Sequence, residues 1–86
     1  MVNINGPWFA QGDVNRPCAV FQAGGVLLLV NDKGSLAKGR FGDPARPNVF
    51  TLDESPEWDT RAGAVEGVVS EDARRIDWPG GGCWMR

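Results

Sequence analysis

The feature that most constrains this chain is a rhythm of short apolar runs, each ended by glycine, proline, asparagine or aspartate. Residues 24–41 show it most clearly: Val26–Val30 is one extended run, residues 31–34 (Asn-Asp-Lys-Gly) make a turn, and residues 35–41 run back. Runs of this length, separated by turn signals, are typical of antiparallel β-sheet proteins. The sequence therefore predicts an all-β meander.

The length limits this meander to one small domain. A chain of 86 residues buries roughly 60–65% of its unfolded surface, which is enough for one thin core. Its 12 glycines and 6 prolines are spread along the chain, so they indicate turns rather than a linker. We expect residues 1–86 to form a compact antiparallel meander barrel or flattened sandwich of seven to eight short strands. The expected strands are residues 6–11, 17–22, Val26–Val30, 35–41, 48–52, 64–70, 74–78 and 82–86.

Charge and hydropathy disfavour two classes of partner. The net charge is −2, and apart from Arg74-Arg75 the basic residues are isolated, so nothing resembles a stripe that follows nucleic-acid phosphates. The longest apolar run, Val26–Val30, is far shorter than the roughly 20 residues that span a bilayer. The start of the chain lacks the basic and apolar regions of a signal peptide, which leaves the cytosol and a mature exported domain as alternatives.

The residue inventory argues against an enzyme. There is no histidine to act as a base for a serine, threonine or cysteine nucleophile, and the two cysteines do not have a zinc-site spacing. The acidic segment 53–63 matches no calcium-loop pattern. We therefore expect no catalysis, metal or cofactor. Cys18 and Cys83 are either a disulfide that closes a long loop or two buried thiols.

Tryptophans are the strongest candidates for a binding site. Trp78 and Trp84 flank the turn at residues 79–82 and are expected to approach each other across the last hairpin, whereas Trp58 lies in the acidic segment. An exposed tryptophan pair can stack on a sugar ring or an apolar ligand, and the alternative is that these rings fill a small core. Gln22 and Asn31 could hydrogen-bond the ligand or, alternatively, backbone groups at the barrel rim.

The segments NGPWF, CAVFQAGG and GSLAKGRF resemble the opening of the calycin-like barrels, which include avidins, lipocalins and small bacterial protease inhibitors. In that group a Gly-x-Trp begins the first strand, and its tryptophan plugs one end of the barrel; Gly6 and Trp8 match this element. The resemblance covers about the first 41 residues and the last few. It implies a barrel that binds rather than catalyses, and it implies that Arg86 packs over Trp8, as a late basic residue does in lipocalins.

Two functions from different classes remain. The first is a non-enzymatic binding module for a carbohydrate or a small apolar ligand, using Trp58, Trp78 and Trp84. The second is a structural or protein-interaction domain, either a homo-oligomer or an inhibitor-like partner. Val26–Val30 is apolar on both faces, so either it lies centrally in a sandwich or a partner chain covers its outer face. On this ground we expect a homo-oligomer.

Overall fold

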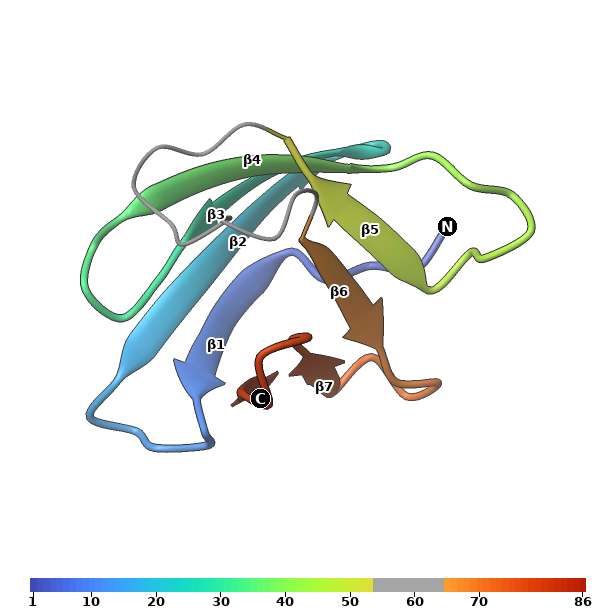
Figure 1. Ribbon diagram of the computed structural model, residues 1–86. Coiled ribbons are helices and arrows are strands. Elements are labelled where there is room, and N and C mark those ends of the chain that lie inside the picture. Colours follow the sequence, from blue (N-terminus) through green and yellow to red (C-terminus); the bar gives the residue numbers. More distant parts are fainter. Residues whose placement is uncertain (54–64) are drawn as a thin grey trace.

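Alternating apolar and polar residues produce eight antiparallel strands in the computed structural model, which describes residues 1–53 and 65–86. Each strand pairs with the next, and β8 pairs with β1, so the sheet closes into a barrel (Figure 1). The predicted all-β meander is confirmed, and it takes the barrel form. The strands are β1 (Gly6–Ala10), β2 (Pro17–Ala23), β3 (Val26–Val30), β4 (Leu36–Phe41), β5 (Val49–Leu52), β6 (Glu66–Val69), β7 (Arg75–Asp77) and β8 (Cys83–Met85).

The expected strands agree with these bounds within one or two residues, and the differences have local causes. Trp78 was expected to end the seventh strand, but it belongs to the following turn, because its carbonyl accepts a hydrogen bond from the Gly81 N–H at 3.1 Å. Gly81 has a φ of 93°, which glycine adopts without steric cost. The turn after β3 is as predicted: the Gly34 N–H donates to the Asn31 carbonyl at 3.0 Å, and Gly34 has a φ of 82°.

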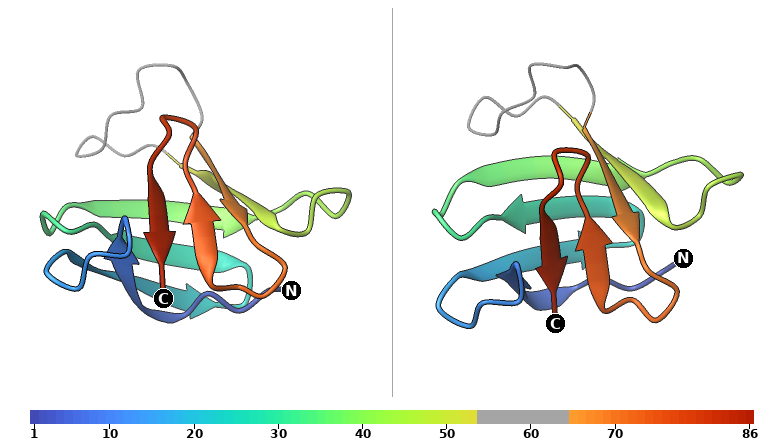
Figure 2. Two further views of the ribbon diagram at one scale, coloured as in Figure 1. Left: turned by 90° about the horizontal axis from the view of Figure 1, so that it is seen from below. Right: turned by 60° about the horizontal axis from the view of Figure 1, so that its bottom comes forward.

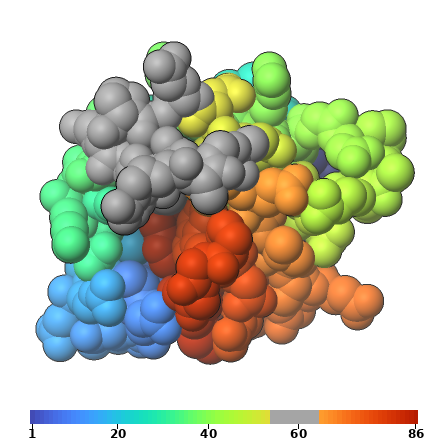
Figure 3. Space-filling view, viewed as in Figure 1, coloured from blue at the N-terminus to red at the C-terminus, as the bar shows by residue number. Residues whose placement is uncertain are grey.

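The strands differ in length and direction. The longer strands β2, β3 and β4 lie side by side, and the short strands β7 and β8 run at a steep angle to them (Figure 2). The last strand also lies against the N-terminal hairpin, where Figure 3 shows the C-terminal residues beside the N-terminal ones. This seam rests on two register pairs, Phe9 with Met85 and Ala10 with Trp84. It is the one pairing in the described strands that joins distant parts of the chain.

Alternate side chains fill the barrel interior, as strand geometry requires. Cys18 and Val20 of β2 and Ala37 of β4 point inward, and all three are buried. Trp8, Phe50 and other large side chains complete the core, which is close-packed around them.

One end of the barrel is closed by Trp8 and by the segment that precedes β1. The Trp8 side chain is completely buried, and its indole Nε1 donates to the Ile4 carbonyl at 2.8 Å. The Arg86 guanidinium lies 4.4 Å from the centre of the Trp8 ring, so the expected contact between these two residues is present. Arg86 also donates to the carbonyls of Asn3 (2.8 Å) and Asn5 (3.1 Å). A single side chain therefore fastens the N-terminal segment across this end.

Candidate functional site

The predicted approach of Trp78 and Trp84 is confirmed. Their ring centroids lie 5.1 Å apart with an interplanar angle of 74°, an edge-to-face contact across the β7–β8 hairpin. The cluster continues from Trp78 to Phe50 (5.6 Å, 84°) and from Phe50 to Phe41 (5.5 Å, 72°). Pairs of this kind each add about 0.5–1.5 kcal/mol beyond the burial of their area. The cluster therefore stabilises the barrel as well as offering aromatic surface.

The tryptophans predicted to form a site differ in how deeply they are buried. Trp84 points inward opposite Ile76 and is only 5% exposed, so its ring is part of the core. Trp78 is half-buried at the edge of the same cluster. Trp58 lies outside the described residues. Of the two tryptophans that the structure describes here, Trp78 is thus the less buried one.

Gln22 uses its side chain to hold the N-terminal segment. Its amide oxygen accepts from the Ile4 N–H at 2.8 Å, and its amide nitrogen donates to the carbonyls of Val2 and Gly24, both at 3.0 Å. These bonds satisfy backbone groups at the closed end of the barrel, which is the alternative that the sequence left open. A ligand-binding role for Gln22 stays a prediction.

Asn31 organises the β3–β4 turn at the opposite end. Its side-chain oxygen accepts hydrogen bonds from the backbone N–H groups of Lys33 (3.0 Å) and Ser35 (2.9 Å). An asparagine that bonds its own turn in this way replaces a backbone acceptor and favours the turn conformation. Its predicted role toward a ligand likewise stays a prediction, since these bonds explain its position without one.

The two cysteines are both free and buried. The strand register explains why they do not form a disulfide: Cys18 pairs with the inward residue Trp8, whereas Cys83 pairs with the outward residue Asp77. The thiols therefore lie on opposite faces of the barrel wall. Burial raises the pKa of the Cys18 thiol to about 11, so this thiol is poorly suited to act as a nucleophile.

The outer surface of the barrel is divided into an apolar half and a charged half. The apolar half comprises the outward positions of β1, β2 and β3 together with Leu36 of β4; none of these positions carries a charge. The charged half lies on β4 to β7 and carries Lys38, Arg40, Glu66, Arg75 and Asp77. Sequence reasoning located only the Val26–Val30 part of the apolar half, because the rest emerges when the faces of neighbouring strands are combined.

The most exposed part of the apolar half is centred on the β2–β3 hairpin. Phe21 is 58% exposed and Val26 65% exposed, and Phe21 pairs across the strands with Leu28. These side chains line a shallow groove of about 560 Å³, with Lys38 at its β4 border. The groove is therefore an apolar surface with a single cation at its rim.

Comparison of the chain with protein-family models, with curated proteins and with solved structures gives no match. Within residues 1–53 and 65–86, no helix is long and apolar enough to cross a membrane. The same residues contain no group of three or more histidine, cysteine or carboxylate side chains placed to hold a metal ion.

Proposed function

We propose that this chain is a non-enzymatic binding domain that acts through protein contacts, and that a second copy of the chain covers the part of its apolar half centred on the β2–β3 hairpin. The observation that supports this is the uneven distribution of charge around the barrel. The outward positions of three neighbouring strands carry no charge, whereas the remaining outer surface carries both signs. A contiguous apolar face on a small domain is typical of an interaction surface.

The exposed side chains offer enough free energy for a weak dimer. Complete burial of a valine, leucine or phenylalanine side chain contributes about 1.5–3 kcal/mol. Phe21, Val26 and Leu36 are 58%, 65% and 48% exposed, so covering them contributes roughly 3–5 kcal/mol from each copy. Two copies contribute about 6–10 kcal/mol, which is comparable with the cost of association of about 4–15 kcal/mol. With the cost at the lower end of that range, the net gain is at most about 6 kcal/mol, so we expect a weak dimer with a dissociation constant of tens of micromolar to about 1 mM.

The chemistry of the apolar half favours a second copy over a charged partner. A two-fold dimer places the same patch on both subunits, and an uncharged apolar patch is complementary to itself. Lys38 is the β4 register partner of Leu28 and borders the groove, so a dimer centred on Phe21 of β2, two strands away, leaves this charge toward its rim. An apolar centre with charges at the rim is the usual arrangement of homodimer interfaces.

Light scattering coupled to gel filtration, over protein concentrations up to about 1 mM, tests this proposal. We expect the apparent mass to rise from one chain to two, and Phe21→Glu to keep the mass at one chain. The matched controls are Val26→Gln and Val68→Gln, because both valines are exposed but Val68 lies on β6 in the charged half. Val26→Gln should weaken association, and Val68→Gln should leave it unchanged.

Two results would overturn the proposal. One is a wild-type mass of a single chain at the highest concentration. The other is an equal effect of Val26→Gln and Val68→Gln on association, since the interface would then not be the apolar half. A thermal melt of each variant establishes that it is folded before its mass is interpreted.

A small-ligand site at Trp78 is a second candidate, which the half-buried ring at the edge of the aromatic cluster favours. Its ligand would be a carbohydrate or a small apolar molecule that stacks on the indole. We expect such a ligand to shift the tryptophan emission of the wild type and not that of Trp78→Phe. Identical shifts in both proteins would exclude Trp78 as the site.

A further inference from the structure

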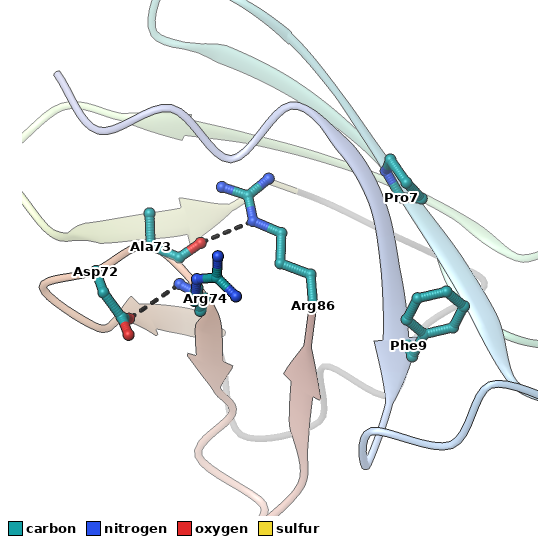
Figure 4. A pocket seen from close by; sticks show the side chains of 6 residues that line it. All are labelled: Pro7, Phe9, Asp72, Ala73, Arg74 and Arg86. Carbon is teal, nitrogen blue, oxygen red and sulfur yellow. Dashed lines mark hydrogen bonds between the residues drawn. The ribbon is translucent and has the colours of Figure 1, made fainter.

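A second surface feature lies where the seam between β1 and β8 ends, beside the β6–β7 turn. It is an open pocket of about 450 Å³, on the same closed end of the barrel as Trp8. Figure 4 shows two guanidinium groups on one side of it and an aromatic ring and a proline on the other. Its lining residues are Pro7, Phe9, Asp72, Ala73, Arg74 and Arg86.

The two arginines of this pocket differ from the others in the described part of the chain. Four arginines there form an ion pair with a carboxylate, namely Arg16, Arg40, Arg46 and Arg75. Within residues 1–53 and 65–86, neither Arg74 nor Arg86 has such an ion pair. The two arginines that lack a carboxylate partner in this region therefore line the same pocket.

The backbone around the pocket holds the Arg86 side chain and the main chain of Arg74 in place. The Arg86 Nε donates to the Ala73 carbonyl at 2.8 Å, and the Arg86 N–H donates to the Arg74 carbonyl at 3.1 Å. Ala73 has a φ of 57°, a left-handed conformation that is uncommon for alanine. The turn is thus fixed in a strained form that presents one carbonyl to Arg86.

The carboxylate in the pocket does not neutralise the pair. Asp72 accepts hydrogen bonds from the Ser70 hydroxyl at 2.7 Å and from the Arg74 N–H at 3.1 Å, both within its own turn. The Ser70 hydrogen bond, followed by the Arg74 N–H, lowers the pKa of Asp72, so Asp72 is ionised at neutral pH. With two guanidiniums and one carboxylate, the pocket retains a net positive charge.

We propose that this pocket binds an oxyanion carried on an apolar ring, with the anion between Arg74 and Arg86 and the ring against Phe9 and Pro7. The Arg74 guanidinium can offer paired N–H groups that match carboxylate and phosphate oxygens in geometry as well as in charge. The three nitrogens of Arg86 already donate to the carbonyls of Ala73, Asn5 and Asn3, so Arg86 contributes mainly its positive charge. The apolar wall supplies the contact that a bare ion would lack. This inference goes beyond the proposed dimer, because it concerns a small ligand at the β1–β8 seam.

Titration with benzoate, phenyl phosphate and the neutral benzyl alcohol tests the inference, with backbone and aromatic NMR shifts as the readout. We expect saturable shifts at Phe9, Ala73, Arg74 and Arg86 with at least one of the anions and none with the alcohol. The anion that binds more tightly identifies the head group. Equal binding of benzyl alcohol, or no saturable shift with either anion, would overturn the proposal.

Neighbouring arginines provide a matched pair of variants. Arg74→Gln removes one guanidinium from the pocket and should weaken anion binding roughly tenfold. Arg75→Gln removes an arginine that pairs with Asp77 outside the pocket, so it should leave the affinity unchanged. Equal weakening by both variants would mean that general attraction to positive charge explains the binding, and the site would be refuted.

Phe21→Glu separates this inference from the proposed function. Its substitution is on the β2–β3 hairpin and not in the pocket, so the monomeric variant should bind the anion as the wild type does. Anion binding without dimerisation would support the anion site and refute only the dimer. Dimerisation without anion binding would do the opposite.

Discussion

Gly67 lies directly under the Phe50 ring, and replacing it with alanine tests how tightly the aromatic cluster is packed. The two residues are register partners on β6 and β5, and Gly67 faces inward. An added Cβ would lie 2.6 Å and 2.7 Å from the two Cε atoms of Phe50, and closer still to Cζ. The ring would have to move, because carbon atoms that are not bonded pack at about 3.5–4.0 Å.

The cost of this movement follows from what holds the ring. Phe50 is completely buried and makes edge-to-face contacts with Phe41 and Trp78. Overpacking of a core costs about 1–3 kcal/mol, and loss of two aromatic contacts costs a similar amount. The smaller entropy of the unfolded alanine chain offsets about 0.4–1 kcal/mol. We expect Gly67→Ala to lower the free energy of unfolding by about 3 kcal/mol, a fall in Tm of about 12–24 °C.

Thermal melts followed by circular dichroism measure this, and two further variants isolate the cause. Gly80→Ala is the matched control, because a Cβ there would meet nothing within 4 Å and Gly80 is not among the residues with positive φ. In a double-mutant cycle, Phe50→Leu should remove most of the penalty of Gly67→Ala, since the contacting ring atoms are gone. A Gly67→Ala melt like that of Gly80→Ala, or an undiminished penalty beside Phe50→Leu, would refute the reasoning.

Three other substitutions test the closed end, the thiol and a turn. Trp8→Phe leaves the buried Ile4 carbonyl without its donor and should cost about 1–3 kcal/mol, measured by urea unfolding. Burial raises the pKa of Cys18 to about 11 from the unfolded value of 9.0. The contribution of this protonated thiol to the free energy of unfolding is therefore complete below pH 9 and is lost as the pH rises through 11. Stability measured between pH 8 and 11 should therefore fall more steeply in the wild type than in Cys18→Ala; parallel profiles would contradict this. Asn31→Ala removes two hydrogen bonds of the β3–β4 turn and should lower stability by about 1 kcal/mol; an unchanged melt would show that the turn does not need them.

Local patterns predicted the strands and turns of this barrel because their causes are local. Asn31 and Gly34 specify a turn through their own hydrogen bond and φ, and Trp78 and Trp84 meet because a hairpin brings its ends together. The contact between Arg86 and Trp8 came from family resemblance, since no spacing rule connects residues so far apart. These are the parts of the fold and of the candidate site that the sequence could specify.

The remaining features depend on how strands are placed beside one another. The face on which Cys83 lies follows from the register of β8 against β7. With three residues, β8 is too short for alternating apolar and polar residues to show which face is inward. Likewise, Arg74 meets Arg86 only because β8 pairs with β7 and ends beside the β6–β7 turn. Such non-local placement is fixed by the tilt and stagger of a closed barrel rather than by any one segment.

The bond between Arg86 and the Asn3 carbonyl also brings the last residue of the chain against the segment that precedes β1. Every strand is hydrogen-bonded to two neighbours in a closed ring, so the order of strands has no natural beginning. A short peptide joining the two ends, with a new opening at the Gly24 turn, would preserve all eight pairings. The closed order of strands therefore permits circular permutation, and the side chain of Arg86 lies near the place where the two ends would be joined.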